Sequence, residues 1–182
     1  MEDLTDRELL DRFANPETRN YAFNLLVRKY QQRLYWHIRK MVIDHEDTDD
    51  LLQNVLIKVF KALDNFREDS QLYTWMYRIA TNECITFLNS KRKRFFIPVV
   101  NVEAELSKNL ESDAYFSGDR IQMKLQQALL TVPEKQRLVF NMKYFEDMKY
   151  EEISEILGTS VGALKASYHH AVKKIEEFLK RD

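Results

Sequence analysis

The sequence predicts an all-α protein of two helical domains joined by a flexible linker. Apolar residues recur at helical spacing through most of the chain, and capping residues stand where helices are expected to begin. The 182 residues also include only three glycines and three prolines. Because β-sandwiches and α/β enzymes with glycine-rich loops need frequent turn residues, this composition argues against both classes. With 45% hydrophobic residues the chain can bury a core, which excludes a disordered polymer.

Residues 1–92 are predicted to form the first domain, which begins with two helices. Thr5 followed by Glu8 is a capping-box pattern at the start of the first helix, and Pro16 lies just after its end. Residues 17–42 then form a long amphipathic helix, because their apolar positions lie close to helical spacing. These positions are Tyr21, Leu25, Tyr30, Leu34 and Ile38.

Two further helices complete this domain, and a linker follows. One helix begins near Thr48 or Asp49, whose side chains suit a helix start, and the other extends over about residues 72–89. Residues 93–119 lack clear periodicity, and from position 103 they hold five acidic residues and one lysine. We therefore expect this segment to be a flexible linker between two domains.

Residues 120–182 are predicted to form a second domain with a helix-turn-helix. Pro133 suits the first position of a helix that extends to about Tyr144. A shorter helix spans about residues 150–157, Gly158 fits the position after its end, and Ser160 caps a longer last helix. A short helix, a turn with a glycine and a longer basic helix are typical of a helix-turn-helix. The apolar positions that open this domain are Ile121, Leu125, Leu129 and Leu130.

The charge balance first argues against a nucleic-acid-binding protein, because 28 basic and 29 acidic residues give a net charge of -1. The charges are segregated, however. Residues 28–40 hold five basic residues and no acidic one, whereas residues 44–50 hold five acidic ones. Such blocks indicate either faces for charged partners or ordinary solvated helix faces, so net charge alone does not exclude DNA.

The outward face of the last helix is a candidate DNA-reading surface. Recognition helices present their N-terminal residues to base edges in the major groove. Small residues there allow close approach, while lysine and histidine donate hydrogen bonds to bases or phosphates. An ordinary helical hairpin with a basic face is the structural alternative. The outward positions are Gly162, Lys165, Ala166, His169, His170 and Lys173.

Two tyrosines are a second candidate contact with nucleic acid. Tyr73 and Tyr77 lie four residues apart and therefore share one side of their helix. Aromatic side chains in this arrangement stack on unpaired bases in single-strand binders. Packing inside the domain is the favoured alternative for both rings.

Catalytic, metal and membrane signatures do not appear in the sequence. It contains no phosphate-binding P-loop, serine-hydrolase or zinc-protease motif, so we expect neither an enzyme nor a cofactor. The single cysteine, Cys84, excludes an internal disulfide and a cysteine-based zinc site. There is no apolar run of about 18 residues that would span a membrane. The first residues lack a signal-peptide pattern, and we expect a cytoplasmic protein.

Four segments in order resemble the extracytoplasmic-function group of bacterial sigma factors, over nearly the whole chain. Residues 49–63 look like the family's core-polymerase-binding helix, and residues 74–82 are similar to its W-L-x-R-I-A-x-N segment. Residues 132–140 resemble L-P-x-x-x-R-x-V-F, and residues 150–162 resemble Y-x-E-I-A-x-x-L-x-x-S-x-G. Four matches at the expected spacing are much more specific than any one of them.

The resemblance implies that the first domain binds core RNA polymerase and opens the −10 promoter element. The loop 69–71 would cradle a flipped base of the non-template strand, and Lys58 and Asn82 would contact DNA where melting starts. The implied −10 contacts, with the two tyrosines, are Lys58, Asp69, Ser70, Gln71, Tyr73, Tyr77 and Asn82. The implied polymerase contacts are Asp49, Asp50, Leu52, Gln53 and Asn54.

The resemblance also implies that the second domain reads the −35 element through its last helix. Its base-reading positions would be those of the outward face, Gly162, Lys165, Ala166, His169 and His170, with Lys143 and Tyr150 as phosphate-positioning residues. The sequence departs from the family at Asn54, where an acidic residue is common, and it lacks two arginines of the recognition helix. Base preference therefore cannot be carried over.

The implied partners are core RNA polymerase, promoter DNA and an anti-sigma factor, and the free chain would be a monomer. A stand-alone helix-turn-helix transcription regulator is the first alternative, and it would be expected to form dimers. A helical interaction protein without DNA binding is the second alternative. It leaves the basic character of Lys165, His169 and His170 unexplained.

Overall fold

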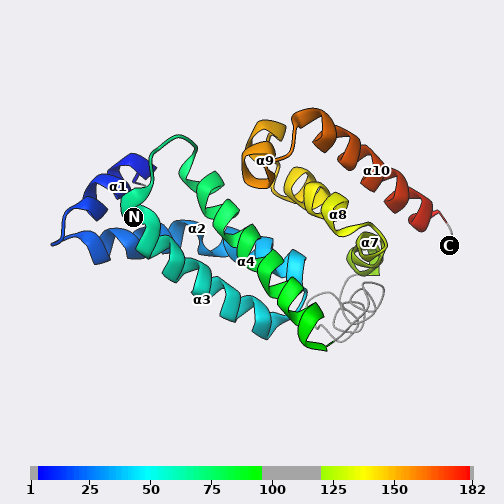
Figure 1. Ribbon diagram of the computed structural model, residues 1–182, viewed down its shortest axis with the longest axis horizontal. Coiled ribbons are helices and arrows are strands. Elements are labelled where there is room, and N and C mark those ends of the chain that lie inside the picture. Colours follow the sequence, from blue (N-terminus) through cyan, green and yellow to red (C-terminus); the bar gives the residue numbers. More distant parts are fainter. Residues whose placement is uncertain (1–3, 96–119, 181–182) are drawn as a thin grey trace.

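The computed structural model describes residues 4–95 and 120–180, which are helical apart from short connections (Figure 1). This confirms the predicted all-α class. Most of the predicted linker, residues 96–119, lies outside the described residues. Residues 93–95 belong to the last helix of the first domain, which continues past the boundary expected at residue 92.

Within residues 4–95 the first domain contains four α-helices, and the first begins as predicted. The Glu8 amide donates to Thr5 Oγ1 at 3.3 Å, and the Thr5 amide donates to Glu8 Oε2 at 2.8 Å, which completes the capping box. Leu9 and Phe13 of this helix are buried against the longer helices. The elements are α1 (Asp6–Ala14), α2 (Arg19–Val42), α3 (His45–Ala62), the 3-10 turn η1 (Leu63–Asn65) and α4 (Leu72–Phe95).

Three details of this domain differ from the sequence prediction. The helix α3 begins at His45 rather than near Thr48, because Asp44 Oδ1 accepts the Asp47 amide at 3.0 Å and so caps an earlier start. The helix α4 continues to Phe95 rather than Asn89, since no helix-breaking residue stands in that stretch. Tyr21 was expected to face the core but is 57% exposed.

The second domain contains the predicted helix-turn-helix, formed by α9 and α10. Gly158 ends α9 with φ 62°, a left-handed conformation that glycine adopts without steric cost, and Ser160 Oγ accepts the Ala163 amide at 3.4 Å to cap α10. The elements are α7 (Arg120–Leu130), α8 (Glu134–Phe140), the π-helical turn η2 (Asn141–Phe145), α9 (Tyr150–Leu157) and α10 (Val161–Leu179).

The start of this domain also departs from expectation at two places. Pro133 is the N-cap of α8 rather than its first helical residue, and the helical stretch toward Tyr144 ends in π geometry. Ile121, expected to line a core, is 80% exposed. Leu138, Val139 and Met142 are buried as predicted.

The two domains pack against each other through α4 and α9 (Figure 1). One buried cluster contains Met76 and Tyr77 of α4 together with Met142, Met148 and Ile153 of the second domain. The second domain also has its own core, in which Ala171 and Ile175 of α10 contact Leu129 and Phe140. No sequence pattern indicated the shared cluster, because it joins residues that lie far apart in the chain.

Candidate nucleic-acid interface

The predicted reading face of α10 is exposed along its whole length. Gly162, Lys165, Ala166, His169 and His170 all lie at the surface. On the other side of the same helix, Leu164, Ala171 and Ile175 are buried and fix the helix on the domain. The rings of the two histidines are 6.1 Å apart and tilted by 59°. The helix therefore presents a continuous face of small and basic residues to solvent.

The structure brings together three residues that the sequence places in three different elements. Two cations lie near the Tyr150 ring, with Lys143 Nζ 5.5 Å and Lys165 Nζ 5.8 Å from its centroid. Lys143 Nζ also donates to the Met148 carbonyl at 3.0 Å, which orients the ammonium group. The result is a basic cluster near the N-terminal ends of α9 and α10. A DNA backbone is expected to pass this side of the helix-turn-helix.

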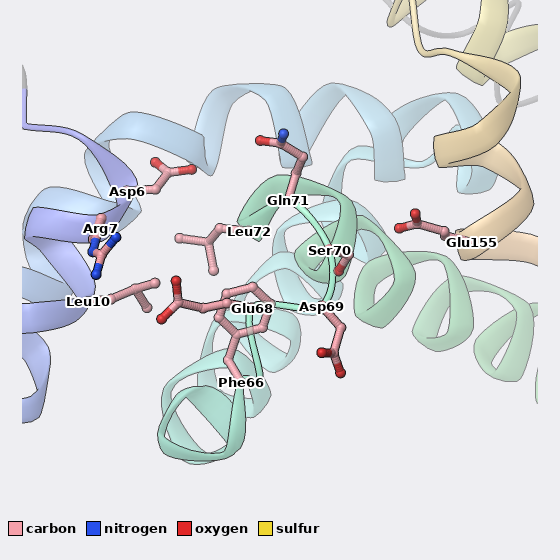
Figure 2. Close-up of a pocket in the computed structure, with 10 residues that line it drawn as sticks. All are labelled: Asp6, Arg7, Leu10, Phe66, Glu68, Asp69, Ser70, Gln71, Leu72 and Glu155. Atoms are coloured by element: carbon pink, nitrogen blue, oxygen red, sulfur yellow. The ribbon is translucent and has the colours of Figure 1, made fainter.

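A pocket of about 480 Å³ lies between α1, the loop before α4 and α9 (Figure 2). Figure 2 shows Arg7 and Leu10 on one side, the loop residues in the middle and Glu155 reaching toward the loop from α9. Glu68 has φ 57°, an uncommon conformation for a residue other than glycine. The lining residues are Asp6, Arg7, Leu10, Phe66, Glu68, Asp69, Ser70, Gln71, Leu72 and Glu155.

The loop that lines this pocket is held at both ends. The Phe66 ring contacts Trp75 of α4 with the centroids 5.1 Å apart, and the Gln71 carbonyl accepts the Trp75 amide at 3.1 Å. The loop is thus anchored at its start by Phe66, and at its end it leads directly into α4. It carries the side chains of Asp69, Ser70 and Gln71. The predicted loop residues are therefore gathered at one pocket.

The pocket is rich in hydrogen-bond acceptors. Four carboxylates line it, those of Asp6, Glu68, Asp69 and Glu155, and Arg7 supplies positive charge. Asp6 is already engaged, because Tyr30 Oη donates to it at 2.7 Å. Burial, together with this carboxylate, raises the pKa of Tyr30. A ligand here is expected to present donor groups rather than phosphate oxygens, which carboxylates repel.

Tyr73 and Tyr77 pack inside the molecule instead of presenting free rings to solvent. Tyr77 is fully buried, its ring lies 4.6 Å from that of His37, and Tyr73 is half-buried. Tyr77 Oη donates to Glu146 Oε2 at 2.9 Å, and Tyr73 Oη donates to Glu152. Burial, then the Glu146 carboxylate, raises the pKa of Tyr77. The packing alternative therefore holds for Tyr77 in this structure.

Lys58 and Asn82 lie on neighbouring helices. Lys58 of α3 pairs with Glu83 of α4, the residue after Asn82, and both Lys58 and Asn82 are exposed. The structure therefore places these two candidate DNA contacts on one surface.

The exposed side of α3 carries the predicted polymerase contacts. Asp49, Asp50, Gln53 and Asn54 are exposed, and Leu52 is half-buried. Ile57, one turn further along, is 52% exposed although it is a large apolar residue. An acidic helix start followed by an exposed isoleucine is a surface suited to a protein partner.

Comparison with known families decides the identity. The sequence model of the family described as Sigma-70 region 2 matches residues 26–94. That of the family described as Sigma-70, region 4 matches residues 122–175. The RNA polymerase sigma-H factor of Pseudomonas aeruginosa is 32% identical over 184 residues, which cover 96% of this chain and 93% of that protein. The chain belongs to the extracytoplasmic-function sigma factors. The ECF RNA polymerase sigma-E factor of Escherichia coli is 30% identical over 185 residues, covering 96% and 94% of the two chains.

Two solved structures share the fold of this sigma factor. One is described as the sigma factor RpoE in complex with the anti-sigma factor NepR from Bartonella quintana. It has a TM-score of 0.69 and 20% identity and covers 88% of this chain and 98% of that one. Another, CnrH in complex with the cytosolic domain of CnrY, has a TM-score of 0.69 and 24% identity, with 97% and 98% covered.

These matches confirm a promoter-specific transcription factor that associates with RNA polymerase. The stand-alone regulator is not favoured, because the match to region 2 covers most of the first domain, which that alternative leaves without a role. Among the residues that the structure describes, no helix is long and apolar enough to cross a membrane, and no cluster of side chains fits a metal ion.

Sequence reasoning missed several residues that the structure brings to the candidate site. Arg7 and Leu10 line the pocket from α1, Phe66 anchors the loop, and Glu146 contacts Tyr77 from the second domain. None of them carries a spacing signal, because each reaches the site through tertiary packing. The positive φ of Glu68 likewise could not be predicted from the sequence, because glutamate does not favour this conformation.

Proposed function

We propose that the two domains of this sigma factor divide promoter recognition between them. Residues 1–92 bind core polymerase and the −10 element, residues 120–182 read the −35 element, and residues 93–119 connect the two. The observation that carries this proposal is that one chain holds a loop pocket with gathered polar side chains and a separate exposed basic helix face. Single-stranded and duplex DNA call for these two kinds of surface.

The exposed side of α3 is our proposed contact with core polymerase. Gln53 and Asn54 lie one turn after Asp50 on this side of the helix. Ile57, one further turn along, adds exposed apolar area. Polar groups around an exposed apolar side chain resemble the rim and centre of a protein interface. Asp49 and Leu52 flank this surface.

The pocket of the loop 69–71 is our proposed site for a flipped base of the −10 element. Its volume of about 480 Å³ exceeds the needs of one base, and polar and charged side chains make up most of its lining. Carboxylates accept hydrogen bonds from the amino groups of cytosine and adenine, so the lining favours a base with an exocyclic amino group. Arg7 is placed to pair with a neighbouring phosphate or base acceptor. Tyr73, Tyr77, Lys58 and Asn82 complete the proposed −10 surface.

The reading face of α10 is our proposed contact with the −35 element. Lys165, His169 and His170 are exposed donors, while Gly162 and Ala166 allow close approach to the groove. Lys143 and Tyr150 lie at the end of this face and are suited to hold the phosphate backbone.

Four further features belong to this proposal. The sigma factor acts by binding rather than by catalysis, and it acts in the bacterial cytoplasm, where promoter DNA and polymerase meet. It is a monomer when free, and an anti-sigma factor controls it. Control by an anti-sigma factor is supported by a solved relative that is described in complex with the anti-sigma factor NepR. A second solved relative is described in complex with the cytosolic domain of CnrY.

Run-off transcription with purified core polymerase tests the proposal. The native chain should give a promoter-dependent transcript, and Asp50→Arg should abolish core binding measured by fluorescence anisotropy. Asp11→Arg, which makes the same charge change on an exposed position of α1, serves as the matched control. No transcript above core polymerase alone across a promoter library, from a well-folded chain, would overturn the assignment.

A further inference from the structure

Two adjacent histidines lie in the middle of the reading face of α10. His169 and His170 are exposed, and their ring centroids are 6.1 Å apart with the ring planes tilted by 59°. Their side chains leave the helix about 100° apart, so the pair covers a wide sector of the face. A recognition helix reads base edges with its N-terminal residues, and these histidines come more than two turns after the N-cap Ser160. They are therefore better placed for phosphates than for bases.

The charges that surround these rings on α10 are mainly positive. Lys165 lies four residues before His169 and Lys173 lies four residues after it, so the three side chains share one side of the helix. The first acidic residue of α10 is Glu176, which is already paired with Lys180 at 3.7 Å. A DNA phosphate that approaches the middle of this face therefore meets lysine and histidine side chains.

The elements packed against α10 do not reverse this charge. Lys143 of η2 and Lys165 both lie near the Tyr150 ring, which places a further cation at the N-terminal end of the face. The helices α7 and α8 pack against the opposite, apolar side of α10, that of Ala171 and Ile175. The two histidines thus face solvent on the basic side of the helix.

Histidine differs from lysine and arginine because its charge changes between about pH 5 and pH 8. A neutral imidazole offers one N–H donor, whereas the protonated ring offers two donors and a positive charge. A phosphate next to the ring favours the protonated form, so DNA binding at such a position takes up a proton. An arginine at the same place would keep its charge at every physiological pH.

We propose that His169 and His170 bind −35 phosphates as imidazolium ions, which makes promoter affinity rise as the pH falls. The proposal rests on the assignment of the reading face of α10 to −35 DNA. The gain is complete at about pH 6 and below, where the free rings already carry protons, and it is lost toward pH 8, where the complex also releases them. Initiation from promoters that depend on the −35 element then increases when the interior of the cell acidifies.

The pH dependence is tested with holoenzyme and a fluorescent −35 duplex at about pH 6 and about pH 8. The native chain should bind about tenfold more tightly at the lower pH, if each charged contact contributes about threefold. His169→Gln/His170→Gln keeps polar side chains without a titratable charge and should lose this gain. His169→Arg/His170→Arg carries the charge at both pH values and should bind tightly at both.

The comparison between these holoenzymes removes the titration of core polymerase, which is the same in all of them. Circular dichroism checks that each variant is folded, as expected for two exposed positions. A gain at low pH that is as large in the glutamine or the arginine variant as in the native chain would overturn the proposal.

The salt dependence of binding gives a second readout, which a purely structural effect of pH would not change. Each phosphate contact by a charged side chain steepens the slope of the logarithm of the binding constant against the logarithm of the salt concentration by about 0.9. The slope of the native holoenzyme should therefore be steeper at about pH 6 than at about pH 8, and that of the glutamine variant should not change. Equal native slopes at the two pH values would overturn the ionic contact.

Failure of the underlying −35 assignment has a different signature. In that case Lys165→Ala would leave the affinity unchanged at both pH values, and the promoter duplex would bind no better than a scrambled one. If only the histidine proposal fails, the loss caused by Lys165→Ala remains and the pH dependence alone is absent.

Discussion

Tyr77 of the first domain donates a hydrogen bond to Glu146 of the second, with 2.9 Å between the hydroxyl and Oε2. The two residues are 69 positions apart in the chain, and Tyr77 Oη also donates toward the Arg33 carbonyl at 3.2 Å. Burying a carboxylate is costly unless it keeps its partners, so Glu146 depends on Tyr77 and Lys40 together. This one carboxylate thus joins the two domains of the chain through Tyr77 and Lys40.

Replacing Tyr77 by phenylalanine should weaken the free chain. Tyr77→Phe keeps the ring in the core but removes one donor from buried Glu146, which should lower the free energy of unfolding by about 1–2 kcal/mol. Urea unfolding followed by circular dichroism measures the change. Tyr144→Phe removes a hydroxyl from a side chain that is 59% exposed and should change stability little. Equal changes in the free energy of unfolding for the two variants would show that the hydrogen bond from Tyr77 to Glu146 does not stabilise the chain.

Stability should fall between pH 7 and pH 5 because of His37. Burial lowers the pKa of His37 from its ordinary 6.5 to about 4, with Glu146 opposing this shift and Lys40 adding to it. Below pH 6.5 the unfolded chain takes up a proton that the folded chain refuses, so the folded state loses about 2 kcal/mol by pH 5. Urea titrations at several pH values measure this slope. His37→Gln should flatten it, whereas His45→Gln, at an exposed position, should not.

Arg7 should contribute to −10 recognition although it stands outside the matched region 2. Arg7→Ala removes positive charge from a lining that is otherwise acidic, and the holoenzyme should lose about threefold to tenfold in affinity for a single-stranded −10 oligonucleotide. Arg28→Ala makes the same charge change at an exposed position of α2 and should bind normally. A matching loss in the two variants would show a general charge effect rather than a contact in the pocket.

Lys165 should matter for the −35 element and Lys174 should not. Both are exposed on α10, but only Lys165 lies on the reading face beside Tyr150. Holoenzyme carrying Lys165→Ala should bind a −35 duplex at least about fivefold more weakly. The slope of the logarithm of the binding constant against the logarithm of the salt concentration should become shallower by about 0.9. Gel-shift titrations over a range of salt concentrations check this. Core binding should be unchanged, and its loss would contradict the division between the domains.

The two glycines of the helix-turn-helix should respond differently to alanine. Gly158 has φ 62°, so Gly158→Ala should cost about 1–2 kcal/mol of stability although open space surrounds the added methyl group. Gly162 is helical and also open, so Gly162→Ala should leave stability unchanged or slightly raised. The same Gly162 variant should reduce −35 binding, because its methyl group stands on the reading face. Thermal unfolding together with duplex binding distinguishes the two effects.

Local signals in the sequence account for most of the helices. The capping box at Thr5, the cap at Ser160 and the left-handed Gly158 are short-range features, and the structure confirms all three. The sequence predicts the start of α3 too late because Asp44, Thr48 and Asp49 are all acceptable caps, and in the structure Asp44 is the one that caps the helix. Helical periodicity alone predicts that Tyr21 and Ile121 face a core, but both are exposed. Periodicity does not show whether another element covers that face of the helix.

The amino-acid sequence is enough to predict the all-α class, the helix-turn-helix, the outward face of α10 and, through four ordered motifs, the family. These follow from spacings of a few residues, where backbone geometry dictates the outcome. Three contacts come from the packing of whole helices: Arg7 joins the loop pocket, two lysines lie near the Tyr150 ring, and Glu146 accepts a hydrogen bond from Tyr77. Such contacts join residues far apart in the chain, and they form only when whole helices pack, so no local pattern encodes them.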